Sequence, residues 1–213
     1  MNGSEGMGTG SGGTMNKHML IIVLCMGLSL VACGTSVKRV ETEKVIDLSG
    51  QWNDTDSRLV SEEMIKDALS RPWHSAYMTG HGGEQPVVIV GTVRNRSHEH
   101  INVRTFVKDL EGALINSGEV DFVASSEERG EIRDERKDQA VHSSEETAKS
   151  EGEEIGADFM LQGSINSILD KVEGEAVIFY QVNLELIEIE TNKKVWIGEK
   201  KIKKYVKRSR MKL

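Results

Sequence analysis

The sequence predicts a single α+β domain in which helices pack on a mixed or mainly antiparallel sheet. Its 213 residues are enough for one hydrophobic core with appendages. Apolar residues make up 38% of the chain and glycine adds 21 residues, a composition typical of globular proteins. The hydrophobic pattern switches between helical and strand spacing in the order α β α β α α β β β. This order indicates one folded unit of the α+β class.

The first half of the domain is expected to contain two helices and two strands. Apolar residues at three- and four-residue spacing predict the first helix, which Arg71 and Pro72 end. A continuous β-branched run is typical of a strand covered on both faces. The clearest helical stripe follows, and a second short strand closes this half. These elements are expected at about 57–69, 87–93, 103–114 and 120–123.

Two capping boxes and a long hairpin organise the second half. Ser125 with Glu128, and Ser143 with Glu146, each form a Ser-x-x-Glu pattern that predicts the start of a surface helix. Alternating apolar and polar residues then predict strands. The helices are expected at about 126–141 and 144–155, a strand around 159–165, and the hairpin at 176–189 and 195–206 with a turn at 191–193.

The first 32 residues are interpreted as an N-terminal extension followed by a lipoprotein signal peptide. A charged start after Met15 precedes an apolar run that is too short for a membrane span. Either Met15 is the true start, or residues 1–14 are an unusual beginning of the signal.

Cys33 is predicted to carry a lipid. Small residues precede it, which resembles the lipidation site of bacterial lipoproteins, whereas the alternative is a chance cysteine at the end of an apolar run. Several acyl chains make a firm anchor. Residues 33–44 would then be a short tether, and residues 45–213 the globular domain.

No residue pattern predicts an enzyme, a metal site or a cofactor. His98-Glu99-His100 offers two imidazoles, but a metal ion needs a further ligand and a rigid frame, which favours a solvated loop. The loop Gly80-His81-Gly82-Gly83 lacks the Lys and Ser/Thr of a phosphate-binding loop. A net charge of −7 argues against nucleic-acid binding.

Charge is distributed unevenly along the domain. Residues 119–158 contain fourteen acidic and five basic residues, whereas residues 200–212 contain eight basic and no acidic ones. One interpretation is a solvated helix face and an edge strand protected by lysines. The other is that one pole attracts a charged partner or an anionic surface. Protein docking is therefore the expected type of function.

Residues 47–60, which read DLSGQWNDTDSRLV, resemble the opening of the LpoB family, the lipoprotein activators of penicillin-binding proteins. The similarity continues through 101–104, 143–149, 155–164, 180–186 and 195–198. It implies a domain like the N-terminal domain of TolB, with a sheet of about four strands and flanking helices. It also implies an outer-membrane lipoprotein on the periplasmic side that allosterically activates a bifunctional class A penicillin-binding protein, with no catalytic residue of its own.

Trp52, Asn53, Asp54 and Trp196 are the candidate partner-binding residues. The structural alternative is that Trp52 fills the core while Asn53, Asp54 and Asp56 cap the first helix. A monomer is expected. The eleven-residue tether has no proline, unlike the long proline-rich tethers of well-known family members. The alternative function is a structural or secretion-related periplasmic lipoprotein, as in curli secretion, with another protein partner.

Overall fold

The computed structural model describes residues 36–42, 44–150 and 152–207. The chain divides into two compact units, residues 1–44 and residues 45–213. The described part of the first unit contains no helix or strand. Within the described residues, no helix is long and apolar enough to cross a membrane.

Several predictions fall outside the described residues. They are the signal peptide, the choice of Met15 as the start, and the lipidated Cys33. These stay predictions.

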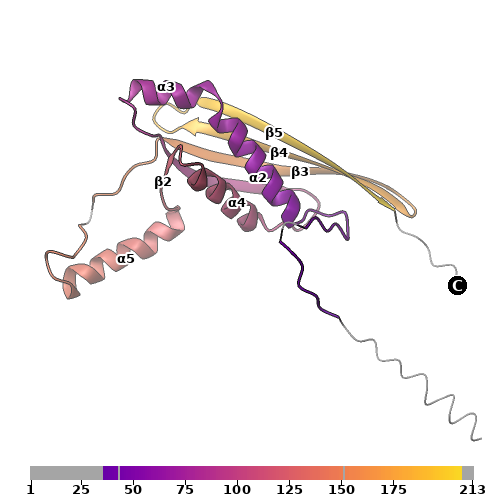
Figure 1. Cartoon of the computed structure of the whole chain (residues 1–213), viewed down its shortest axis with the longest axis horizontal. Helices are drawn as coiled ribbons and strands as arrows, with labels where there is room; N and C mark the ends of the chain where they lie inside the picture. Colours follow the sequence, from indigo (N-terminus) through magenta and orange to yellow (C-terminus); the bar gives the residue numbers. More distant parts are fainter. Residues whose placement is uncertain (1–35, 43, 151, 208–213) are drawn as a thin grey trace, which may run out of the picture. The chain divides into compact units, whose positions relative to one another are not determined.

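The second unit is built on one mixed sheet of five strands (Figure 1). Its order is β2-β1-β3-β4-β5; β1 runs parallel to β2 and β3, and the β3–β4 and β4–β5 pairs are antiparallel. The elements are α2 (Asp54–Leu69), α3 (Pro72–Gly80), β1 (Val87–Arg96), α4 (Val103–Ser117), β2 (Asp121–Phe122), α5 (Ser126–His142), β3 (Phe159–Val172), β4 (Glu175–Glu188) and β5 (Lys194–Lys207). The α+β class and the long hairpin are confirmed. The two-residue edge strand β2 brings the sheet to five strands rather than about four.

The hydrophobic core lies between the sheet and the helices α2 and α4. Alternate residues of β4 from Ile178 to Leu186 point into it, as the period-two pattern predicted. Val60 of α2 and Leu110 of α4 are fully buried against this face. We call this the inner face of the sheet and the opposite one the outer face.

The sheet narrows toward one end. β1 ends at Arg96, which pairs with Asn166, so the sheet beyond this point consists of β3, β4 and β5 only. We call residues 167–180 and 202–207 the three-stranded extension. Figure 1 shows it running past the ends of α2 and α4.

Two helix predictions need correction near α2. The helix begins at Asp54 rather than near residue 57, because Asn53 and Asp56 form a capping box with Asn53 as the N-cap. Pro72 does not simply end the helical region: it opens α3, a helix that was not predicted from the sequence. Proline suits the first turn of a helix because its missing N–H would be unpaired there in any case.

The predicted helix at 144–155 is wrong. The Ser125 capping box opens α5 as expected, but Ser143 is the C-cap of α5 and residues 145–147 form only a turn. The hydroxyls of Ser144 and Thr147 hydrogen-bond to each other at 2.8 Å. The segment has few apolar residues to bury, so the capping pattern has no packing energy to extend it into a helix.

Candidate functional site

The candidate residues lie at the two ends of α2. Trp52, Asn53 and Asp54 precede or begin the helix, and Trp196 lies beside Asp67 near its C-terminus. These ends are about 20 Å apart at 1.5 Å per residue. The structure therefore brings the first three residues together and places Trp196 apart from them.

Trp52 belongs to an aromatic cluster. Its ring is half-buried and meets Phe106 of α4 edge-on at 6.0 Å and Tyr180 of β4 at 5.6 Å between ring centroids. Such edge-to-face pairs stabilise a core beyond the burial of their area. Trp52 thus fixes the start of α2 against the sheet, as its structural interpretation expected.

Asn53 and Asp54 differ in exposure although they are neighbours. The Asn53 side chain accepts a hydrogen bond from the Asp56 N–H at 3.0 Å, and the Asp56 carboxylate accepts one from the Asn53 N–H at 3.0 Å. Asp54 is exposed in the first turn, where a negative charge is favourable to the helix dipole. Of the three residues, Asp54 is the one whose side chain is open to a partner.

Glu99 joins the Trp52 segment to the sheet. Its carboxylate accepts a hydrogen bond from the Trp52 N–H at 3.2 Å and another from the Tyr180 hydroxyl at 2.7 Å. Burial of Tyr180, and then its hydrogen bond to Glu99, raise the pKa of this tyrosine. The His98-Glu99-His100 loop therefore has a structural role, which the sequence analysis missed because both partners are distant in the sequence.

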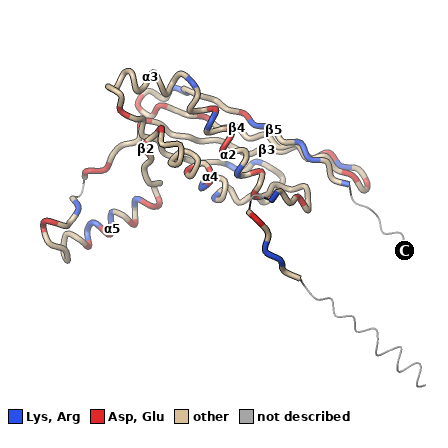
Figure 2. Tube along the Cα trace, viewed as in Figure 1, with Lys and Arg blue, Asp and Glu red and all other residues tan. Residues whose placement is uncertain are grey.

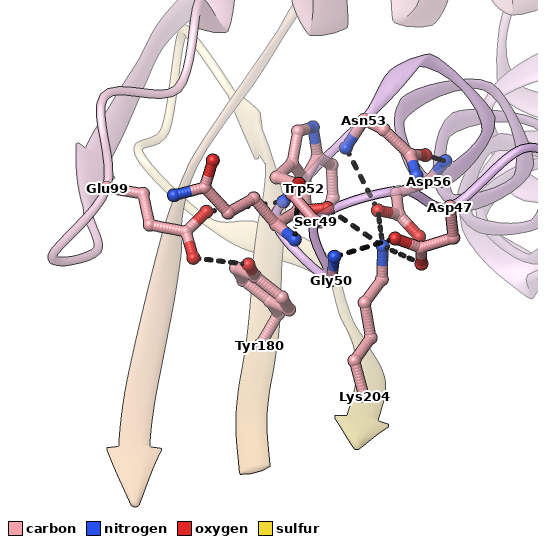
Figure 3. Close-up of polar contacts among 10 residues, drawn as sticks. Asp47, Ser49, Gly50, Trp52, Asn53, Asp56, Glu99, Tyr180 and Lys204 are labelled. Atoms are coloured by element: carbon pink, nitrogen blue, oxygen red, sulfur yellow. Dashed lines mark hydrogen bonds and ion pairs between the residues drawn. The ribbon is translucent and has the colours of Figure 1, made fainter. Parts of the chain in front are cut away.

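Lys204 of β5 holds the segment before α2. Its ammonium group lies 2.5 Å from the Asp56 carboxylate and 2.8 Å from that of Asp47, and it donates to the Gln51 carbonyl at 2.9 Å (Figure 3). The Lys204 side chain is only 10% exposed. Burial opposes its charge, but the hydrogen bonds to Asp47 and Asp56 outweigh it and raise its pKa. The hydrogen bond from Lys204 likewise lowers the pKa of Asp47. We call Asp47, Gln51, Asp56 and Lys204 the Lys204 cluster.

Gly50 lets the chain pass close to β5 at this point. Its φ is +73°, and a Cβ atom built there would overlap the Val206 side chain. Its N–H donates to the Asp47 carboxylate at 2.9 Å. Only glycine combines this backbone conformation with such close approach at low cost.

Trp196 fixes the other end of α2. The side chain is 6% exposed, and its indole N–H donates to the Asp67 carboxylate at 2.9 Å. The hydrogen bond from Arg71, followed by the one from Trp196, lowers the pKa of Asp67. Both candidate tryptophans thus hold α2 in place, and the solvent-exposed side of the helix between them is fixed in position.

A groove of about 550 Å³ opens beside the Lys204 cluster. Its lining comes from the segment before α2 (Ser49 and Gln51), from the loop after β1 (His98 and His100), and from the extension, including its turn. Among the described residues, no group of three or more His, Cys, Asp or Glu is arranged to hold a metal ion.

The acidic segment is partly neutralised within the domain. Lys108 of α4 lies 2.8 Å from Glu128, and Glu154 binds Arg133 and Arg136 of α5, each at 2.8 Å. No residue of α5 is buried, which confirms the expected surface position. Figure 2 shows Lys and Arg along the three-stranded extension, with acidic residues near its turn.

Comparison with solved structures finds similar folds of low sequence identity. The LpoB C-terminal domain from Salmonella enterica is 16% identical with a TM-score of 0.40, covering 69% of this chain and 98% of that one. The domain from Escherichia coli is 18% identical with a TM-score of 0.38, covering 67% and 97%. The NMR structure of E. coli LpoB is 14% identical with a TM-score of 0.39, covering 97% and 94%.

No curated protein sequence matches the chain. The family model of the peptidoglycan-synthase activator LpoB, however, matches residues 56–202, from the first turn of α2 to the middle of β5. This match spans well over half of the chain. The chain therefore belongs to the LpoB family of peptidoglycan-synthase activators.

Proposed function

We propose that the chain is an exported lipoprotein that binds and allosterically activates a bifunctional class A penicillin-binding protein. In this proposal Cys33 carries the lipid and anchors the protein to the outer membrane on its periplasmic side, and the domain acts as a monomer. The observation that carries it is the family match over residues 56–202. The lipidation pattern at Cys33 supports it independently.

The exposed side of α2 is the proposed contact with the synthase. It carries Asp54, Glu62 and Glu63 beside Leu59, which is 48% exposed, and thus combines charge with an apolar side chain. Trp52, Asn53 and Trp196 act in the proposal by holding this surface in position. A preformed surface loses little conformational entropy on binding, which favours affinity.

Activation requires the domain to distinguish two states of the synthase. A bound protein shifts an equilibrium only by its difference in affinity for the two states, and it needs no catalytic group for this. A rigid helix surface suits the task because it fits one arrangement of the synthase better than another. The activator is thus proposed to be a regulator and not an enzyme, without a cofactor.

The short tether limits where this contact is made. Residues 34–44 span less than about 40 Å even when fully extended. The proposal therefore places the bound synthase domain within this distance of the lipid anchor plus the length of the activator's own folded domain.

The test is a reconstitution with purified components. The mature chain with Cys33→Ser should retain a detergent-solubilised class A synthase and raise its rate of glycan polymerisation. Leu59→Lys should abolish the stimulation, since it places a charge in the proposed contact. The matched control is Ile132→Lys on α5, where the isoleucine is 41% exposed, and it should leave stimulation unchanged. Absence of binding and stimulation would refute the proposed function, and equal loss in both variants would refute the α2 contact.

A further inference from the structure

We propose that the outer face of the three-stranded extension docks on the anionic lipid surface of the membrane that holds the anchor. This inference rests on the lipid anchor of the proposed function. It adds a second membrane contact, made by the folded domain itself.

The register of the strands gathers apolar side chains on this face. Residues directly opposite one another on paired strands lie on the same face of the sheet. Along one strand, every second residue also lies on the same face. The three rows are Ile168–Phe179–Lys203, Asp170–Val177–Tyr205 and Val172–Glu175–Lys207. Their neighbours Ile178 and Tyr180 point to the inner face and are buried. The outer face of the extension therefore has an apolar centre.

These apolar side chains are well exposed. Ile168, Val172 and Tyr205 are 66%, 70% and 62% exposed, and Phe179 and Val177 between them are half-buried. We call these five residues the outer patch. A sheet does not cover its own face, and exposed apolar patches of this kind mark interaction sites.

Cations border the outer patch. Lys201, Lys203 and Lys207 lie along β5, and Arg94 and Arg96 lie on the same face of β1, all of them exposed. The acidic groups among these side chains are Asp170, Glu175 and Glu199. Glu175 pairs with Lys207 at 3.1 Å and Glu199 with Lys201 at 2.5 Å, so Lys203, Arg94 and Arg96 supply the remaining positive charge. Apolar side chains surrounded by lysine and arginine suit the boundary between lipid headgroups and acyl chains. Long basic side chains can also reach the headgroups while their stems cover apolar surface.

The segment that follows the tether is fastened to the inner face of the extension, opposite the outer patch. The Lys204 cluster fastens Asp47 to β5, and Gly50 lies against Val206. The chain from Cys33 to Asp47 spans at most about 48 Å. The tether thus keeps the extension close to the membrane, and this high effective concentration lets a weak patch dock.

The distribution of charge and the strand order favour the same orientation of the domain on the membrane, with the extension toward the lipid. β2, which lies in the acidic segment 119–158, pairs with Val87 and Val88 at the end of β1 that is farther from the extension. An anionic surface repels that end and attracts the extension. Because α2 packs on the inner face, docking through the outer face leaves α2 directed away from the membrane and accessible to a partner.

The test measures binding of the non-lipidated mature chain, Cys33→Ser, to vesicles. Vesicles of phosphatidylglycerol and phosphatidylethanolamine should sediment the protein, and phosphatidylcholine vesicles should not. Lys203→Glu should lower the partition coefficient at least tenfold, since each unit of charge near such a surface changes it about fivefold. The control Lys193→Glu makes the same charge change in the turn at the other end of the hairpin and should alter binding less than twofold.

A second pair of variants tests the apolar contribution. Ile168→Ser should weaken vesicle binding at least threefold, whereas Ile197→Ser, at a site that is 62% exposed on β5, should not. The inference is overturned if the chain does not bind anionic vesicles. It is also overturned if each control variant loses as much binding as the patch variant with which it is matched. It is also overturned if the chain is a dimer that Ile168→Ser converts to a monomer, since the patch would then bind a second copy. Stimulation of a solubilised synthase should survive Lys203→Glu, so the two proposals fail separately.

Discussion

Lys204→Met is expected to destabilise the domain because it leaves two carboxylates without their cation. Methionine keeps the length and packing of the side chain but loses all three contacts of the ammonium group. The Asp56 side chain is 11% exposed, so the variant would leave this carboxylate without its cation in a largely buried position. Removing one partner of a fully buried ion pair costs about 3–5 kcal/mol.

The expected loss here is smaller, about 2–3 kcal/mol. Asp56 keeps its hydrogen bond from the Asn53 N–H, and Asp47 keeps the one from Gly50 and is 36% exposed to water. In urea denaturation of the mature chain, the midpoint should fall by roughly 1 M with an unchanged slope. Lys203→Met is the control: this lysine is exposed on the outer face of the same strand, and the change should stay within about 0.5 kcal/mol.

The pH dependence follows from the direction of each pKa shift. Because the pKa of Asp47 is lowered, this carboxylate contributes fully to the free energy of unfolding above about pH 3.8, the ordinary pKa of an aspartate. That contribution is lost as the pH falls through the lowered pKa. The raised pKa of Lys204 means that its contribution is lost only as the pH rises through that value, in the alkaline range. The difference in free energy of unfolding between wild type and Lys204→Met should therefore be largest near neutral pH and become smaller toward pH 3. A variant within 0.5 kcal/mol of wild type at pH 7 would refute the role of Lys204.

Three further outcomes are expected. Tyr180→Phe removes the hydrogen bond to Glu99 and should lower the free energy of unfolding by about 1–2 kcal/mol, measured by urea denaturation; a value near zero would show that the bond adds nothing. Gly163→Ala should lower the free energy of unfolding by more than about 2 kcal/mol in urea denaturation, because a Cβ atom there would overlap a backbone carbonyl of β4. A variant as stable as wild type, with an unchanged circular dichroism spectrum, would contradict this packing. The hydrogen bond from Lys108 lowers the pKa of Glu128 to about 2, so this carboxylate should stay charged until well below pH 4 in an NMR titration, and Lys108→Met should return its pKa toward 4.5.

The fold was predictable wherever one short stretch carries its own pattern. The alternating residues of β4 and the stripe of α4 predicted both elements and the faces they bury. The helix at 144–155 failed because a capping pattern satisfies backbone groups locally but supplies no apolar face. α3 was missed because Pro72 is compatible both with the end of one helix and with the start of the next.

The site was predictable in its position but not in its contacts. The dense run of turn and capping residues around Trp52 and Asn53 pointed to the start of α2, although the helix was expected to begin three residues later than it does. Its partners Glu99 and Lys204 could not be found from the sequence. Glu99 is 47 residues from Trp52 along the chain, and Lys204 is 148 residues from Asp56. Only the sheet order, which places β5 at the edge beside the segment before α2, brings these groups together.

The same contacts explain how one domain can serve two surfaces at once. The Lys204 cluster fastens the segment that follows the tether to β5, and Asp56 of that cluster also belongs to the capping box of α2. The proposed membrane contact and the proposed partner contact therefore share a rigid connection and lie on opposite faces of the sheet. Loosening this connection at Lys204 should reduce synthase activation by the lipidated protein in a membrane more than activation by the soluble chain in detergent, because only the former depends on a fixed orientation of α2.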